Sequence, residues 1–477
     1  MKRLLLPTLI TLALGACAVG PDYQRPAMDL PQSLAADARP DARVDLNWWT
    51  AFNDPVLDAF EQRASVYNRD LLAAIARVDE AAAQLTSTRA DLLPQLNGAA
   101  GGQRGQPSSL LPSSGLQPGQ KVIGEQYNAS LQASYELDLW GKLRRATEAS
   151  RAELLSSQAA RDTVALTVAA SVANGYFQLR TYDEQLDIAR RTLKSREDAL
   201  VLRKKRFEGG LISELDYRQA EAETATARAA VPLYEQLVSQ AETALKVLIG
   251  ASPREIYQGE VSRGKALSTL NVPPTPPSGL PSDLLLRRPD VVAAEQQLVA
   301  ANARIGVARA AYFPDITLTA ALGSASLALG DLFTGPAALW SFAGDLTMPI
   351  FNWGKTGAGV DIANARQKQA LASYEQSVQN AFRDTRDALV AQQKTAEQLV
   401  AQNTQVSAYT RTTRLARLRY DNGYSSYIDV LDSERSLFSA ELDRANTRLA
   451  RLQAAISVFR ALGGGYGQLQ DAGKPAG

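Results

Sequence analysis

The sequence RFEGGLISELDY at residues 206–217 is built like a tight turn between two helices, and a variant of it, RYDNGYSSYIDV, occupies residues 419–430. At a constant offset of 213 residues the two stretches match in the pairs Arg206 and Arg419, Phe207 and Tyr420, Glu208 and Asp421, Gly210 and Gly423, Ser213 and Ser426, and Asp216 and Asp429. In each copy the glycine can supply the positive φ that ends a helix. The serine, followed three residues later by an aspartate, is typical of the N-cap of a returning helix. The sequence therefore predicts the same helical tip twice.

The repeat extends well beyond the tip. Further matching pairs are Trp140 and Trp353, Lys142 and Lys355, Asp70 and Asp290, and Pro94 and Pro314. The last two pairs are offset by 220 residues, so the seven-residue difference lies between Pro94 and Trp140, where residues 101–120 are rich in loop formers. The chain is thus predicted to be a duplication, with the proline-rich sequence NVPPTPPSGLPSD (271–283) joining its halves.

Each half contains one stretch that alternates between apolar and polar residues, at 127–139 and at 340–350. This alternation predicts strands with one apolar face. A weaker alternation at 315–322, and a glycine-rich stretch that opens at Leu96, add one partner strand to each half. One hairpin per half is therefore expected.

These strands are few, long and isolated between helices, which favours a membrane sheet over the edge of a soluble β-sandwich. A tilted transmembrane strand needs about 10 residues. Trp140 and Trp353 follow the two clearest strands, where aromatic side chains gather at a membrane interface. Four strands cannot close a barrel, and an open sheet in lipid leaves edge groups unsatisfied. We therefore expect several chains to share one barrel.

The remaining sequence predicts helices of unusual length. Residues 142–206 and 355–419 contain no proline, and each run has 65 residues, which is about 100 Å of continuous helix. An apolar stripe of this kind usually indicates a coiled-coil face, but its length far exceeds that of an ordinary globular helix. Each half is thus expected to form a helix, a hairpin, a very long helix, a tip and a long helix.

The N-terminus has the features of a lipoprotein signal peptide. Lys2 and Arg3 precede an apolar stretch at residues 4–14, which is too short to span a bilayer, and the sequence then continues Leu-Gly-Ala to Cys17. We expect cleavage before Cys17 and a covalent lipid on its thiol, which anchors the mature chain to outer-membrane lipid. The alternative is an ordinary signal peptide with an incidental cysteine.

Composition argues against several classes of function. The chain has no histidine and one cysteine, and its formal net charge is +1. These counts remove the commonest general base and metal ligand, exclude an intrachain disulfide, and give no indication of nucleic-acid binding. No Walker sequence is present. We therefore expect no enzyme, no metal and no cofactor besides the lipid.

Four features together resemble the outer-membrane factors of the TolC family, in its OprM-like lipoprotein branch of RND efflux systems. They are the lipoprotein motif followed by VGPDY (19–23), LPSDLLLRRPDVVAAEQQL (280–298), the paired Trp-Gly-Lys motifs and the paired tips. The resemblance covers nearly the whole mature chain. It implies a mixed α and β membrane protein: a homotrimer with a twelve-stranded transmembrane β-barrel, four strands per chain, continuous with a periplasmic α-helical barrel and a small mixed equatorial region.

The resemblance also implies a function and partners. Members of the family are outer-membrane exit channels that receive small molecules from an inner-membrane RND-type pump through a periplasmic membrane-fusion adaptor. A duct for type I protein secretion is the runner-up, and an anchored periplasmic coiled-coil scaffold is the alternative of a different class.

The tips carry the expected sites. By resemblance, the candidates for adaptor docking are Gly210, Leu211, Ser213, Gly423, Tyr424 and Ser426; the alternative is that the glycines and serines only cap helices. Asp429 and Asp432 resemble the aspartates that form rings at the periplasmic gate, and the alternative is a pair of solvated charges at a helix start. Where TolC has an arginine four residues before the first aspartate, this chain has Ser425. Arg419 and Tyr420 are the possible substitutes for the pairs that lock the closed gate.

The expected segments are a signal peptide (1–16), a lipidated N-terminal segment with equatorial belt (17–55), a first repeat (56–270), the linker (271–283), a second repeat (284–462) and a C-terminal tail (463–477). The hairpins are expected at about 95–140 and about 315–353, and the tips at about 207–213 and about 420–426.

Overall fold

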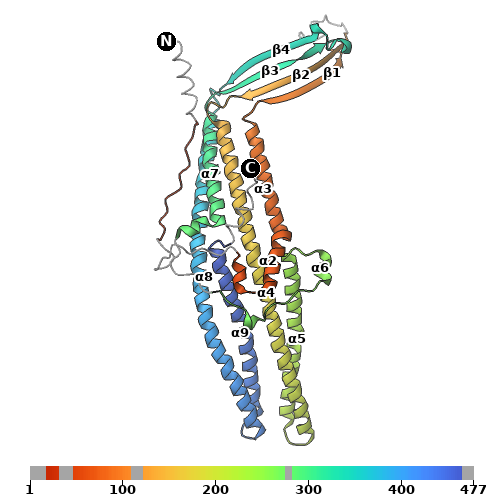
Figure 1. The fold of residues 1–477 in the computed structure, drawn as a ribbon, viewed down its shortest axis with the longest axis vertical. Helices are drawn as coiled ribbons and strands as arrows, with labels where there is room; N and C mark the ends of the chain where they lie inside the picture. Colours follow the sequence, from red (N-terminus) through yellow and green to blue (C-terminus); the bar gives the residue numbers. More distant parts are fainter. Residues whose placement is uncertain (1–17, 32–46, 109–121, 274–281, 465–477) are drawn as a thin grey trace. The chain divides into compact units, whose positions relative to one another are not determined.

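The computed structural model describes residues 18–31, 47–108, 122–273 and 282–464 (Figure 1). The chain divides into two compact units. The sheet unit comprises residues 1–27, 78–156 and 294–374, and the tip unit comprises residues 28–77, 157–293 and 375–477. Each unit draws segments from both sequence repeats.

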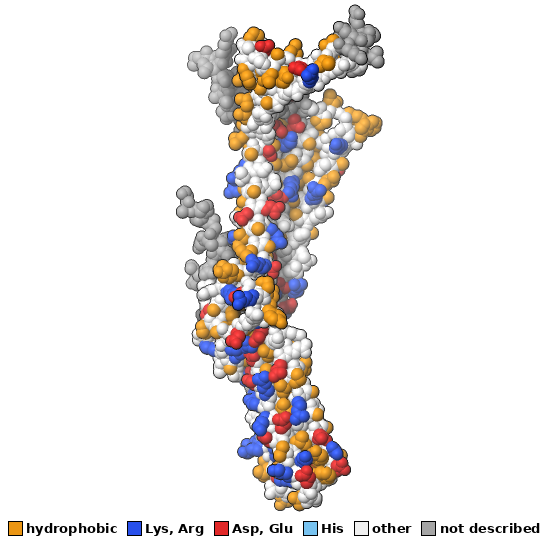
Figure 2. All heavy atoms as spheres, turned by 90° about the vertical axis from the view of Figure 1, so that its right-hand side faces the viewer, with side chains coloured by type: hydrophobic (Ala, Val, Ile, Leu, Met, Phe, Trp, Pro, Cys, Tyr) orange, Lys and Arg blue, Asp and Glu red, His pale blue; other side chains and the backbone are white. Residues whose placement is uncertain are grey.

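The sheet unit contains a four-stranded antiparallel sheet in the order β1-β2-β3-β4. The strands are β1 (Gln95–Gly105), β2 (Gly124–Glu136), β3 (Asp315–Ser326) and β4 (Ala338–Thr347). Each half thus contributes one hairpin, as predicted, and β2 pairs with β3 to join the two. The sheet carries few charged side chains, whereas both signs of charge are mixed over the helices of the tip unit (Figure 2).

The predicted extent of the last strand is wrong at its end. β4 ends at Thr347, so Met348 and Ile350 lie beyond it. Pro349 lies between them, and proline cannot donate a hydrogen bond to a strand ladder.

The duplication is visible in the bounds of the helices. The paired helices are α3 (Arg69–Ala90) with α7 (Pro289–Ala310), α4 (Lys142–Glu208) with α8 (Lys355–Asp421), and α5 (Glu214–Leu248) with α9 (Tyr427–Ala461). α4 and α8 have 67 residues each, and α5 and α9 have 35 each. The very long helices predicted in each half are therefore confirmed. Left-handed glycines recur in the pairs Gly141 and Gly354, Gly210 and Gly423, and Gly250 and Gly463.

The shorter elements complete the described chain. They are α2 (Pro55–Tyr67), α6 (Pro253–Gln258) and the 3₁₀ helices Trp48–Phe52, Leu267–Thr269, Ser282–Arg287, Leu329–Asp331 and Gly335–Ala337. Among the residues that the structure describes, no helix combines the length and the apolar character needed to cross a membrane.

An aromatic core anchors the tip unit. Trp48 is fully buried and stacks on Phe459 with ring centroids 5.4 Å apart, and Phe52 lies 4.9 Å from Phe177. Asp54 caps α2 and accepts hydrogen bonds from the Tyr176 hydroxyl at 2.6 Å and from a backbone amide at 3.0 Å. The segment before α2 is thus fixed onto the long helices.

Candidate functional site

The two helical tips have the same backbone geometry. In the first, Gly210 has a φ of +73°, and the Leu211 amide donates to the Arg206 carbonyl at 2.8 Å. In the second, Gly423 has a φ of +77°, and the Tyr424 amide donates to the Arg419 carbonyl at 2.9 Å. Each turn is a Schellman motif, in which the left-handed glycine lets the last helical carbonyls find donors. The predicted positive φ values are confirmed.

The serines cap the returning helices. Ser213 Oγ accepts from the Asp216 amide at 3.2 Å, and Ser426 Oγ accepts from the Ile428 amide at 3.4 Å. Both serines have the extended backbone of an N-cap. The helix-capping alternative therefore accounts for these glycines and serines without a partner protein.

Capping does not explain the large apolar side chains at the tips. Leu211 and Tyr424 are each 77% exposed. They follow the two left-handed glycines, a position where an apolar side chain often packs on the last helical turn, but most of their surface is left uncovered. Exposed apolar side chains at matched positions are suited to contact with another protein.

A buried arginine joins the two helical hairpins behind the tips. Arg203 of α4 is 5% exposed, and its guanidinium lies 4.4 Å from the centroid of the Tyr420 ring and 4.7 Å from that of the Tyr427 ring. Next to it, Arg206 Nη1 lies 3.2 Å from Asp421 Oδ1. Burial raises the pKa of Tyr420 and Tyr427 above their ordinary value, although the Arg203 charge opposes this. Cation–π contacts of this kind become stronger as they are desolvated.

Sequence reasoning missed Arg203. Tyr420, a gate candidate, meets Arg203, whereas Arg419 is exposed and makes no ion pair or ring contact among the described residues. One signal was available: the repeat-equivalent of Arg203 is Ala416. In this pair the arginine makes a contact between the hairpins that its alanine counterpart cannot make.

Asp429 and Asp432 lie on the exposed face of α9, one turn apart, while Val430 and Leu431 between them are buried. No hydrogen bond or ion pair joins either carboxylate to another side chain within the described ranges. The structure therefore brings Tyr420 into the contact between hairpins and leaves the two aspartates on the surface.

A second ionic group also joins the hairpins. Glu223 of α5 lies 2.9 Å from Arg196 of α4 and also pairs with Arg435 of α9. Glu223 is 8% exposed, and its two oxygens are shared between the two guanidinium groups. Arg203 and Glu223 thus connect the same two hairpins at two successive positions along the long helices.

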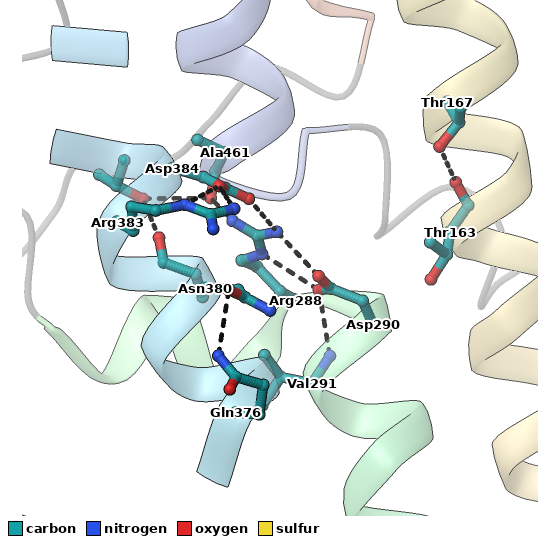
Figure 3. Close-up of polar contacts among 12 residues, drawn as sticks. Thr163, Thr167, Arg288, Asp290, Val291, Gln376, Asn380, Arg383, Asp384 and Ala461 are labelled. Atoms are coloured by element: carbon teal, nitrogen blue, oxygen red, sulfur yellow. Dashed lines mark hydrogen bonds and ion pairs between the residues drawn. The ribbon is translucent and has the colours of Figure 1, made fainter. Parts of the chain in front are cut away.

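Arg288, near the end of the motif LPSDLLLRRPD, fixes the start of α7. Figure 3 shows Arg288 pointing at Asp290, Asp384 and the end of α9. Its guanidinium contacts Asp290 at 2.8 Å and Asp384 at 3.4 Å, and Nη1 donates to the Ala461 carbonyl at 3.1 Å. The first repeat makes the equivalent contact with a different residue, because Asn68 Nδ2 donates to the Leu248 carbonyl at 2.8 Å. This part of the family-like motif therefore has a structural role.

The two predicted interface tryptophans differ. Trp140 is half-buried, stacks on Phe313 with centroids 4.7 Å apart, and donates from Nε1 to the Pro314 carbonyl at 2.9 Å. Trp353 is 89% exposed and lies edge-on to Phe351. Cys17 lies outside the described residues.

Comparison with known proteins agrees with this architecture. The family model for outer membrane efflux proteins matches residues 61–251 and 280–464. The cation efflux system protein CusC of Escherichia coli is 36% identical over 466 residues, with 97% of this chain and 99% of that protein covered. The toluene efflux pump outer membrane protein TtgF of Pseudomonas putida is 39% identical over 480 residues, with 98% of each chain covered.

Solved structures give the same answer for the fold. The Campylobacter jejuni CmeC outer membrane channel superposes with a TM-score of 0.87 at 28% identity, covering 94% of this chain and 95% of that one. A crystal structure of CusC gives 0.83 at 35% identity, covering 94% of this chain and all of that one. The predicted resemblance to outer-membrane factors is confirmed, and since the family model matches both sequence repeats, the chain belongs to the outer membrane efflux protein family.

Proposed function

We propose that this chain is the outer-membrane exit duct of a tripartite efflux pump and that three copies form one channel. The observation that carries the proposal is the four-stranded sheet, whose outer strands β1 and β4 each have one unpaired edge. Unpaired strand edges are unfavourable in lipid. Edge-to-edge joining of three sheets would satisfy them in a closed twelve-stranded barrel.

The apolar surface of β4 supports placing this sheet in lipid. Trp340, Phe342 and Leu346 lie on one face of the strand, and all are exposed. The lipid on Cys17 would tether each copy to the same membrane. The chain would act as a conduit without catalysis or cofactor, and the energy would come from its partners.

The partners follow from the tips. A periplasmic membrane-fusion adaptor would contact Leu211, Tyr424 and the neighbouring Gly210, Ser213, Gly423 and Ser426, and would connect the duct to an inner-membrane RND-type pump. Asp429 and Asp432 would face the threefold axis as rings of carboxylates that favour cations. Arg419 would face the same opening, and Tyr420 would hold the hairpin through Arg203.

The native mass of the protein tests this proposal first. Protein extracted from outer membranes in mild detergent should contain three chains per particle, and the same particles should conduct ions in a planar bilayer. A monomer without conductance would contradict the duct and favour an anchored scaffold. Export of an unfolded polypeptide in place of small molecules would favour a type I secretion duct.

A further inference from the structure

We propose that the outer strands β4 and β1 of neighbouring copies join in the register that β2 and β3 use within one chain, and that Trp353 docks on Leu93 and Pro94 of the next copy. The proposal rests on the proposed assembly of several copies into one barrel, and it names the residues that meet where two copies join. All of these residues lie within the sheet unit. Figure 1 shows β1 and β4 as the two outer strands of the sheet.

The two hairpins of the sheet have the same register. Gln95 pairs with Ser134 in the first hairpin, and Asp315 pairs with Thr347 in the second. Asp315 lies 220 residues after Gln95, and Thr347 lies 213 residues after Ser134, which are the two offsets of the sequence repeat. The repeat offsets therefore hold along all four strands, and the sheet is one hairpin used twice.

The junction between the hairpins shows how two such units join edge to edge. In this junction Ser134 of β2 lies opposite Thr319 of β3. β4 is the copy of β2, and β1 is the copy of β3, so the same junction between two chains places Thr347 opposite Ala99 of the next copy. A slip of one residue would turn the apolar face of one sheet toward the polar face of the other.

The root of the sheet supplies a second template. Trp140 follows β2, stacks on Phe313 with ring centroids 4.7 Å apart, and donates from Nε1 to the Pro314 carbonyl at 2.9 Å. The two residues that it contacts precede β3, so the tryptophan after one hairpin holds the start of the next hairpin. The repeat-equivalents of these three residues are Trp353, Leu93 and Pro94.

These counterparts lack the contacts that the duplication predicts for them. Trp353 is 89% exposed, and Leu93 is 65% exposed. Trp353 meets the ring of Phe351, but its indole Nε1 has no hydrogen-bond acceptor among the described residues. Trp353 also has a φ of +55°, which a bulky residue rarely adopts and which Trp140 does not share. Docking on the next copy would cover both exposed side chains and supply the acceptor.

The membrane interface is the other environment that suits an exposed tryptophan at the end of a strand. Lipid headgroups would cover Trp353, but they would leave the edges of β1 and β4 unpaired. Contact between copies accounts for the tryptophan, for the exposed Leu93 and for the strand edges together. A crosslink from position 353 separates the two environments.

Disulfide crosslinking tests the register. Full-length protein that carries Ala99→Cys and Thr347→Cys is assembled in outer membranes, oxidised and separated without reductant. Residues directly opposite each other in an antiparallel pair have Cα atoms about 4.5–5.5 Å apart, which is within the range of a disulfide. We expect crosslinked dimers and trimers, whereas either single variant should give none.

Displaced cysteine pairs are the matched controls. Asn97→Cys or Gly101→Cys, each combined with Thr347→Cys, places the two cysteines diagonally, about 7–8 Å apart. The pair with Ala99→Cys should therefore give at least about fivefold more crosslinked protein than either displaced pair. A stronger crosslink from a displaced pair would overturn the proposed register.

An intrachain pair calibrates the oxidation. Ser134→Cys with Thr319→Cys places two cysteines opposite each other at the junction within one chain, where they should close a disulfide and lose their free thiols. If this pair closes and Ala99→Cys with Thr347→Cys does not join chains, the two junctions differ and the proposed register is wrong.

Photo-crosslinking tests the docked tryptophan. Trp353→p-benzoylphenylalanine should join two chains on irradiation, and mass spectrometry should place the new bond in the segment that contains Leu93 and Pro94. Trp140→p-benzoylphenylalanine is the control and should react within its own chain, near Phe313. Adducts at position 353 with lipid alone, or with another segment of the next copy, would overturn the docking.

The number of chains per crosslinked particle reports separately on the proposed duct. Crosslinked species that stop at three chains agree with a closed twelve-stranded barrel. Crosslinks in the proposed register within particles of another size would refute the trimer and leave the junction intact. Trimers that crosslink only at displaced positions would leave the duct intact and refute the junction.

Discussion

Arg288 is a single buried cation that holds three chain segments together. Its neighbours Asp290 and Asp384 are about one-third exposed at their side chains, which moderates the strength of the ion pairs. We expect Arg288→Ala to lower the free energy of unfolding by about 2 kcal/mol, because the carbonyl of Ala461 and the carboxylates lose their shared donor. Denaturant unfolding of the detergent-solubilised protein, followed by circular dichroism, measures the change.

The matched control for Arg288 uses the same carboxylate. Arg383 also pairs with Asp384, at 2.7 Å, but is 64% exposed. Arg383→Ala should change the free energy of unfolding by less than about 0.5 kcal/mol. Equal losses of unfolding free energy in the two variants would show that the buried contacts of Arg288 stabilise the fold no more than an exposed ion pair does.

Glu61 makes the stability of the tip unit depend on pH. It is 3% exposed, Oε1 has no hydrogen-bond partner, and burial together with the nearby Asp58 carboxylate raises its pKa well above the ordinary value. The folded state therefore keeps this proton to a higher pH than the unfolded state. Stability should fall as pH rises from the ordinary pKa of glutamate toward the raised one.

Replacement of Glu61 by a neutral isostere should remove that dependence. We expect Glu61→Gln to be more stable than the unaltered protein at pH 8 and to lose this advantage at pH 4, as measured by the denaturant midpoint. Glu80→Gln, on the exposed surface of α3, is the control and should be neutral at both values. If the denaturant midpoints of Glu61→Gln and the unaltered protein differ by the same amount at every pH, Glu61 is excluded as the titrating group.

At the scale of elements, the exposed face of α9 sets the expected ion selectivity. The double variant Asp429→Ala with Asp432→Ala should lower the cation-to-anion permeability ratio at least about twofold and abolish block by multivalent cations, because it removes the proposed carboxylate rings. Single-channel recording in asymmetric salt measures both. Asp443→Ala, an exposed carboxylate farther along the same helix, should leave the records unchanged. Unaltered selectivity in the double variant would contradict the carboxylate rings. The two aspartates would then act only as solvated charges at the start of a helix.

Structural elements that are determined by residues close together in the sequence could be predicted. The tips follow from Gly210 and Ser213 and their copies, and the long helices follow from runs without proline. The end of β4 could also have been predicted, because Pro349 was visible. Contacts between segments far apart in the sequence could not be predicted in this way. Arg203 meets side chains more than 200 positions away, and nothing in its neighbourhood indicates that it is buried. A comparison of the halves, such as Arg203 with Ala416, would have marked it as a candidate.

At the scale of the whole molecule, assembly in the membrane should depend on one face of β4. Phe342 is 69% exposed, and Ser341 points to the opposite face. A cation on a lipid-facing strand position costs about 2–4 kcal/mol at the middle of the bilayer. Phe342→Lys should therefore reduce the heat-resistant oligomer recovered from outer membranes severalfold, whereas Ser341→Lys should leave it nearly unchanged. Equal effects would mean that this apolar face does not meet lipid.

The equal length of α4 and α8 constrains the gene as well as the protein. Loss of seven codons from one of these helices, together with seven from the helix that returns from its tip, would shorten that hairpin by about 10 Å and withdraw one tip while its twin stayed in place. A partner that must touch both tips would then lose half of its contacts. A loss of equal length from the other hairpin would restore the level of the two tips. Related genes should therefore gain or lose length in these helices in pairs.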